Sequence, residues 1–184
     1  MLDKEITIPK ALHELHGQKT RISTLGTVYL ASFIVAGVAV HQILPGGLPA
    51  WKVLLVLILY LDIAGGVVAN LSTSTNRFYQ EKTQLRVGFI LLHCLHPALF
   101  ISVLPESWPY FVFVGIFTLA SALLVNAFRD TEFQQNLAAL LVVAGIAVSF
   151  TFDVPLAFFY SFAPFFMIKL IIGFAVRRPA LTAS

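Results

Sequence analysis

The chain of 184 residues is strongly apolar, because hydrophobic residues make up 58% of it and charged residues only 11%, and its mean hydropathy is +0.87. Water-soluble domains of this length do not reach such values, so the sequence predicts a protein embedded in a lipid bilayer. The formal net charge of +3 does not indicate nucleic-acid binding, since the basic residues flank apolar runs and form no patch with interleaved aromatic residues. A single cysteine, Cys94, excludes an internal disulfide and a two-cysteine redox relay.

Residues 1–21 carry several charges and contain no apolar stretch long enough for a signal peptide. Pro9 suits the first turn of a helix, Leu12 and Leu15 fall on one side of it, and Gly17 can end it. We therefore predict a cytoplasmic amphipathic N-terminal segment, with a short helix that lies at the membrane interface.

Six apolar runs follow, and each approaches the length of about 20 residues that a transmembrane helix needs. The runs cover residues 22–43, 51–71, 85–104, 108–128, 133–152 and 154–174. The last two leave almost no connection between them, so they form a tight hairpin, or one of them tilts or re-enters. The predicted fold is an all-α integral membrane protein, a six-transmembrane-helix bundle in residues 22–174, with residues 175–184 as a cytoplasmic tail.

The positive charges indicate how the bundle is oriented, because cytoplasmic loops retain Lys and Arg. Ten basic residues fall on the side of both termini, and Lys52 alone falls on the opposite side; the ten are Lys4, Lys10, Lys19, Arg21, Arg77, Lys82, Arg86, Arg129, Arg177 and Arg178. This pattern predicts a multi-pass membrane protein whose N and C termini are both cytoplasmic. Trp51 and Trp108 then lie at the outer interface, where aromatic residues are enriched.

Asp62, His93 and His96 lie near the middle of the second and third apolar runs. Ionisable groups are unfavourable in hydrocarbon and tend to pair with one another or to mark a functional site. The two runs are neighbours in the chain and are antiparallel, so the three side chains come to similar depth. Pro97 cannot donate a hydrogen bond to the carbonyl of His93, which predicts a kink beside the imidazoles.

Three functions fit this intramembrane polar site. Asp62 and the histidines form a proton-binding relay or solute site in a transporter, because imidazole titrates near neutrality. Alternatively, His93, His96 and Asp62 bind a divalent metal in a membrane-embedded enzyme, since two histidines and a carboxylate are a common ligand set. In the third alternative they only fix helix register in a non-catalytic subunit or scaffold. Transport leads, and the partners are the bilayer and either further copies of the chain or another membrane subunit.

A second polar zone is predicted at the inner rim of the bundle, where helix ends and inner loops meet. Its members are Asn70, Asn76, Arg86, Asn126 and Lys169. Residues 70–76 are expected to form a solvated loop, with an anion-binding site as the alternative. Arg86 shares a helix face with His93 and suits the inner mouth of a polar path. We expect the Lys169 ammonium to extend to the inner headgroups, or else to pair with Asp130 or a substrate anion.

The sequence lacks the motifs of several families of membrane enzymes. Neither the G-x-S-x-G-like site of rhomboid-like proteases nor the H-E-x-x-H motif of membrane zinc proteases is present. The residues therefore indicate no family, and they leave open whether the chain is an enzyme.

Overall fold

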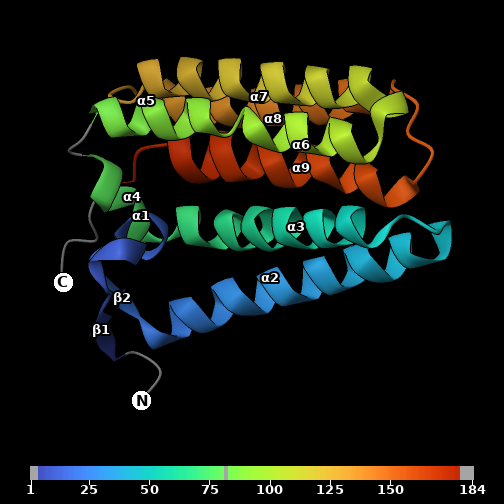
Figure 1. Ribbon diagram of the computed structural model, residues 1–184. Coiled ribbons are helices and arrows are strands. Elements are labelled where there is room, and N and C mark those ends of the chain that lie inside the picture. The colour runs from blue at the N-terminus through green and yellow to red at the C-terminus, as the bar shows by residue number, and fades with distance from the viewer. Residues whose placement is uncertain (1–3, 81–82, 179–184) are drawn as a thin grey trace.

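The computed structural model describes residues 4–80 and 83–178. Long helices lie side by side in a bundle, and their connections gather at two opposite ends (Figure 1). In chain order the helices of the bundle are α2 (Ile22–Ile43), α3 (Ala50–Leu71), α5 (Thr83–Leu92), α6 (Leu95–Val103), α7 (Trp108–Ala127), α8 (Phe133–Ser149), α9 (Phe162–Met167) and the π-helix η5 (Ile168–Ala175). Lys82, residues 1–3 and residues 179–184 of the predicted tail lie outside the described residues.

Within the described ranges, five helical segments are long and apolar enough to cross a membrane. They are Ile22–Gly46, Ala50–Leu71, Gln84–Val103, Pro105–Ala127 and Ala157–Ala175. A sixth apolar helix, α8, is shorter at 17 residues. These helices support the predicted multi-pass, helical membrane protein.

Two predicted boundaries near the C-terminus are wrong. The fifth apolar run stops being helical at Ser149 rather than at residue 152, and the last run begins at Ala157 rather than at residue 154. Residues 150–156 connect them without a regular helix. Asp153 and Pro155 fall in this connection, and proline biases the residue before it away from helix. The connection is therefore longer than the tight hairpin that the sequence suggested.

The last helical segment forms the centre of the bundle. Its buried aromatic residues pack against α3, α6 and α7, and Phe162 and Phe166 have no exposed surface. Large apolar side chains are instead exposed on the outer helices, as at Phe33 (66%), Ile116 (67%) and Val143 (67%). An apolar interior combined with an apolar exterior is the arrangement expected of helices surrounded by lipid.

The N-terminal residues form a compact unit at one end of the bundle (Figure 1). The three-residue strands β1 (Glu5–Thr7) and β2 (Lys19–Arg21) pair antiparallel. Between them lie the 3₁₀-helix η1 (Lys10–Leu12) and the short helix α1 (His13–His16). The predicted helix is thus present in a shorter form, and the two strands were not predicted.

This unit docks on α4 (Thr73–Gln80), a helix that occupies part of the expected solvated loop. The Ser74 hydroxyl donates to the His16 carbonyl, and the Thr75 hydroxyl donates to the Leu15 carbonyl at 3.0 Å. Gly17 has a φ of +74°, and a Cβ there would lie 2.6 Å from the Ser74 carbonyl oxygen. Thr75 and Asn76 are 1% and 2% exposed, so the expectation of a solvated loop is wrong at these positions.

The docked N-terminal unit is expected to loosen at acidic pH. Burial lowers the pKa of His16 from 6.5, so the undocked state binds a proton more readily than the docked state. The free energy that favours the docked N-terminal unit is therefore fully present above about pH 6.5 and decreases as the pH falls below that value. Thermal unfolding in detergent should show a larger fall in Tm between pH 7.5 and pH 5.5 for the wild type than for His16→Gln. The exposed His41→Gln serves as the control and should behave as the wild type; an identical response of His16→Gln would contradict this prediction.

Candidate functional site

The third apolar run is broken at its midpoint, between α5 and α6, where His93 and Cys94 lie. Pro97 leaves the His93 carbonyl without its usual donor, and the His96 amide donates to that carbonyl instead, at 3.2 Å. The His93 amide in turn donates to Ile90, and the His93 Nδ1 donates to the Phe89 carbonyl at 2.7 Å. The kink predicted from Pro97 is confirmed, and it orients both imidazoles.

Side chains from three helices meet on one carboxylate oxygen at this depth. The His96 Nε2 lies 2.7 Å from the Asp62 Oδ2, and the Lys169 Nζ lies 2.5 Å from the same oxygen. The Lys169 ammonium also donates to the Asp62 backbone carbonyl at 3.3 Å. Asp62 lies on α3, His96 on α6 and Lys169 on η5, so we call these residues, together with His93, the central cluster.

A glycine on α3 makes room for Lys169. A Cβ at Gly66 would lie 2.3 Å from the Lys169 Cε and 2.9 Å from its Nζ, so the lysine stem crosses α3 directly over this residue. The neighbouring Gly65 faces Ser32 of α2 in the same way. The two glycines therefore allow close approach on two different sides of α3, as small residues commonly do between membrane helices.

The hydrogen bonds restrict where protons lie in the central cluster. An ionised carboxylate only accepts, so the His96 Nε2 carries a hydrogen. The His96 Nδ1 is buried and has no hydrogen-bond partner among the residues that the structure describes. The His93 ring stacks on that of His96, with 4.9 Å between ring centroids and 6° between the planes. The cluster thus combines an ion pair with an unused nitrogen that can accept a proton.

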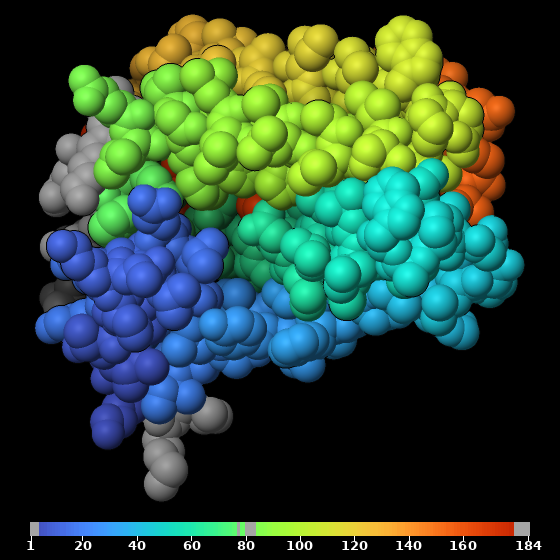
Figure 2. Space-filling model, viewed as in Figure 1, coloured from blue at the N-terminus to red at the C-terminus, as the bar shows by residue number. Residues whose placement is uncertain are grey.

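The carboxylate is the most exposed of the three groups that meet in the cluster. The Lys169 side chain is 2% exposed and that of His96 is 15% exposed, whereas 41% of the Asp62 side chain is exposed. The space-filling view is hollowed between the green surface of α5–α6 and the teal surface of α3, and red atoms of the C-terminal segment are visible through the gap (Figure 2). Such an opening faces sideways from the bundle rather than toward either end.

The predicted metal ligands do come together. One ligand atom each from Asp62, His93 and His96 lies within 4.8 Å of the others. However, the Lys169 ammonium already contacts the Asp62 oxygen, and the His96 Nε2 is engaged with that same oxygen. A metal ion here would compete with the Lys169 ammonium for the charge of Asp62, so this arrangement favours a built-in cation over a bound one.

The expectation that Lys169 extends to the headgroups is wrong, and so is its pairing with Asp130. Its side chain is buried and contacts Asp62, which places it in the central cluster rather than at the rim. Asn70 also lies deeper than expected, because its amide donates to the Lys169 carbonyl at 3.2 Å. The sequence feature that could have indicated the pairing of Lys169 with Asp62 is the position of this lysine close to the middle of the last apolar run.

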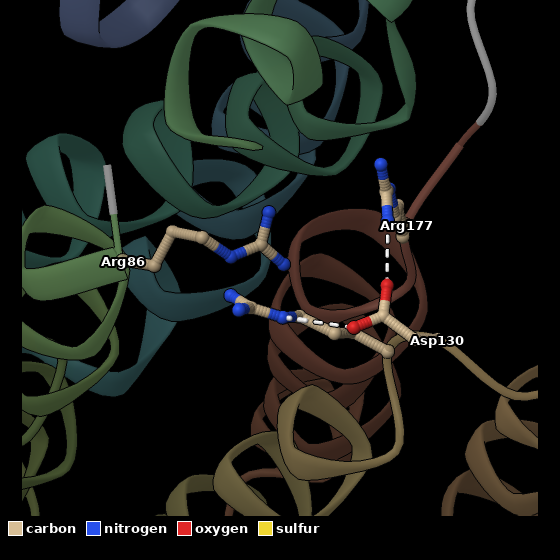
Figure 3. A pocket seen from close by; sticks show the side chains of 4 residues that line it. Arg86, Asp130 and Arg177 are labelled. Carbon is tan, nitrogen blue, oxygen red and sulfur yellow. Dashed lines mark hydrogen bonds and ion pairs between the residues drawn. The ribbon is translucent and has the colours of Figure 1, made fainter. Parts of the chain in front are cut away.

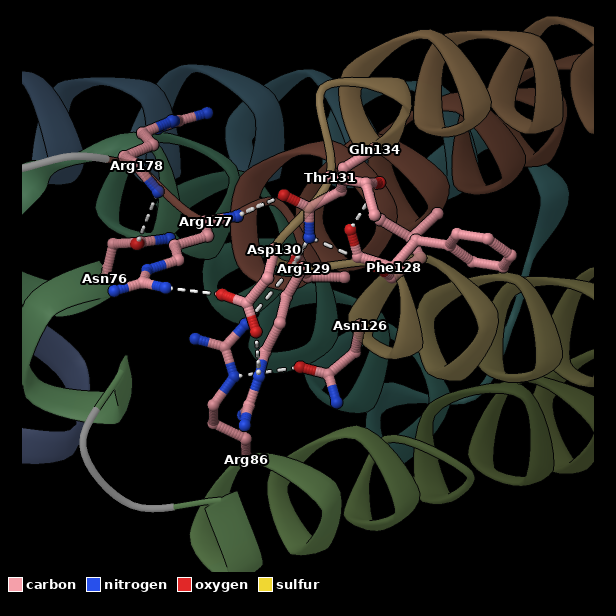
Figure 4. Close-up of polar contacts among 12 residues, drawn as sticks. Asn76, Arg86, Asn126, Phe128, Arg129, Asp130, Thr131, Gln134, Arg177 and Arg178 are labelled. Carbon is pink, nitrogen blue, oxygen red and sulfur yellow. Dashed lines mark hydrogen bonds and ion pairs between the residues drawn. The ribbon is translucent and has the colours of Figure 1, made fainter.

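The other rim residues meet around the end of η5 (Figure 4). The Asn76 amide donates to the Val176 carbonyl at 3.0 Å, and the Arg86 guanidinium donates to the Ala175 carbonyl at 3.1 Å and to the Asn126 side chain at 3.0 Å. Gln134, which the sequence did not single out, donates to the Ala175 carbonyl at 3.1 Å. These contacts satisfy carbonyls that a helix end leaves without donors.

Aromatic rings separate the rim from the central cluster. Phe89 stacks on Phe174 with centroids 4.3 Å apart, and it also contacts the His93 ring, with centroids 4.4 Å apart. The Arg86 guanidinium lies 5.5 Å from the Phe174 ring centroid. Arg86 is therefore not at the mouth of an open polar path to His93, because the two phenyl rings fill the space between them.

Comparisons with protein-family models, with curated proteins and with solved structures find no match for this chain.

Substitution of Gly66 tests the crossing of Lys169 over α3. Gly66→Ala introduces a methyl group into the lysine stem, and overpacking of this kind costs about 2 kcal/mol. For a domain of this size that corresponds to a fall in Tm of about 6 °C. Gly88→Ala on α5 is the matched control, since nothing lies within 4 Å of a Cβ there. Equal Tm values for the two variants would show that the packing of the Lys169 side chain does not require a glycine at position 66.

Proposed function

We propose that the chain is a membrane transporter in which the central cluster binds and releases a proton and thereby couples proton movement to that of a small solute. The observation that carries this proposal is the meeting of Lys169, His96 and Asp62 on one carboxylate oxygen, beside the buried, unused Nδ1 of His96. Ionisable groups that face one another inside a membrane protein are typical of proton relays.

The charges of the cluster explain how one proton would change it. With Asp62 ionised, Lys169 protonated and the histidines neutral, the cluster is balanced. A proton added to the His96 Nδ1 makes an imidazolium, which competes with Lys169 for the same Asp62 oxygen. The three groups lie on three helices, so a change in their pairing alters how α3, α6 and η5 pack. This supplies the two-state element that coupled transport requires.

The solute would enter from the side on which Asp62 is exposed. Phe89 and Phe174 stack on the rim side of the cluster, whereas the molecular surface is hollowed between α3 and α5–α6 (Figure 2). A small amphipathic solute with a positively charged or hydrogen-bonding group would complement the exposed carboxylate.

A metal-dependent enzyme is the second candidate, and the closeness of the three ligand atoms favours it. It requires that the ion either share the Asp62 carboxylate with Lys169 or displace the lysine from it. Metal analysis of the purified protein distinguishes the two functions: stoichiometric zinc or iron that disappears in a His93→Ala, His96→Ala variant would support the enzyme.

The orientation is part of the proposal. We propose six spans, with α8 as the short one, and with both termini in the cytoplasm because of the distribution of Lys and Arg. The N-terminal unit, α4 and the end of η5 share one end of the bundle, which agrees with this arrangement (Figure 1).

Proton flux into liposomes tests the central cluster. Asp62→Asn should lower the flux about tenfold or more, because the carboxylate that organises the cluster is lost. Asp153→Asn is the matched control, since it removes an exposed carboxylate in the connection after α8. Equal flux in Asp62→Asn and the wild type would contradict the proposal.

The ion pair itself is tested by a second set of variants. Lys169→Met leaves a carboxylate without its cation and should destabilise the protein by about 3 kcal/mol or more. The double variant Asp62→Asn, Lys169→Met should recover most of that stability and still lack proton flux. A double variant that carries protons normally would show that the pair is only structural.

Cysteine labelling tests the orientation. In a Cys94→Ala background, Gly46→Cys should react with a membrane-impermeant maleimide from outside the cell, and Lys10→Cys should react only after the membrane is permeabilised. Both positions are exposed, at opposite ends of the bundle. The reverse pattern would overturn the proposed topology.

A further inference from the structure

A cavity of about 190 Å³ lies at the rim, outside the central cluster, and is lined by Arg86, Arg129, Asp130 and Arg177. Figure 3 shows Arg86 reaching it from α5, with Asp130 and Arg177 on the opposite side. At about 30 Å³ per molecule of water, the volume is that of about six waters. This is enough for one small anionic group.

The lining carries an excess of positive charge. Asp130 accepts from the Arg177 guanidinium at 2.5 Å and lies 3.6 Å from the Arg129 Nε, so its two oxygens are directed at two of the arginines. Arg86 has no carboxylate within ion-pair distance among the residues that the structure describes, and it donates to the Asn126 side chain and to the Phe174 and Ala175 carbonyls. The formal charges of the four lining residues, three arginines and one aspartate, sum to +2.

Arg86 makes this a built site rather than a surface patch. Only 1% of the residue is exposed, and its Nε is held by Asn126 while one terminal nitrogen is held by the end of η5. A buried cation without a balancing anion is unfavourable, and an anion in the cavity would relieve this cost. Guanidinium groups bind phosphate through parallel hydrogen bonds, and their planar geometry suits that ligand.

We propose that this cavity binds a phosphate group, supplied either by the headgroup of an anionic phospholipid or by a soluble phosphate compound. Arg86 forms the floor of the site, Arg129 and Arg177 close on the phosphate oxygens, and Asp130 holds these two arginines in place when no phosphate is bound. The site lies where the helices end, at the level of the headgroups in a bilayer, and it connects α5, the α7–α8 connection and the C-terminal segment. Bound phosphate would therefore hold these three segments together.

Binding of inorganic phosphate to the full chain in neutral detergent is the first test. Phosphate, but not chloride at equal ionic strength, should raise the Tm of the wild type. The double variant Arg129→Gln, Arg177→Gln should bind phosphate with an affinity lower by about tenfold or more, because two charge-assisted contacts are lost. Arg21→Gln is the matched control, since Arg21 is exposed on β2 and does not line the cavity.

Asp130→Asn separates phosphate binding from a purely structural role of the rim. Removal of the repelling carboxylate should tighten phosphate binding about threefold, whereas a rim that merely holds the fold together would bind more weakly in this variant as well. Weaker binding in Asp130→Asn would overturn the proposal, as would unchanged binding in the double arginine variant.

A lipid arm of the experiment identifies the source of the phosphate. Native mass spectrometry of protein in nanodiscs of mixed phosphatidylglycerol and phosphatidylcholine should show retained phosphatidylglycerol if the headgroup is the ligand, and the double arginine variant should lose it. Phosphate stabilisation without lipid retention assigns the site to a soluble compound. If neither phosphate nor phosphatidylglycerol binds, the proposal fails, and the proton-flux experiments on Asp62 are unaffected by that result.

Discussion

The positive charge of Lys169 sets the arrangement of the bundle interior. An ammonium group surrounded by apolar helices needs an anion and hydrogen-bond acceptors, and Asp62 supplies both through its side chain and its backbone carbonyl. For the ammonium to reach them, α3 must carry no side chain where the lysine stem crosses, and Gly66 meets that condition. The central position of η5 and its close packing on α3 follow from the same contact.

The π-helix η5 connects the two polar regions of the molecule. Its first turn carries Lys169 into the central cluster, and its last carbonyls are bound at the rim by Asn76, Arg86 and Gln134. π-helical turns are uncommon and are frequent at functional sites. The stacked rings of Phe89 and Phe174 keep the two regions apart. The two ends of one helix are therefore held by polar contacts in two environments, with stacked phenyl rings between them.

Periodicity, length and composition were sufficient to predict the apolar helices, and the missing amide of Pro97 was sufficient to predict the break at His93. Asp62, His93 and His96 were also grouped correctly, because the short connection between their helices fixes them as antiparallel neighbours at one depth. The sequence could not place Lys169, since its partner lies 107 residues away and depends on which helix occupies the centre of the bundle. The two strands that flank the N-terminal helix were missed for a different reason: strands of three residues carry too few side chains to show a period of two.

The partial exposure of the Asp62 side chain, 41%, has a consequence for what can reach it. Because phenyl rings lie on the rim side, a molecule that approaches the carboxylate between the helices has first dissolved in the hydrocarbon layer. The bilayer then selects compounds before the protein does. Compounds enter it according to their partition coefficient, and only afterwards do side chains distinguish their shape. Selectivity in such an arrangement is shared between membrane and protein, so a change in lipid composition would alter which compounds the site encounters while leaving every residue of the cluster in place.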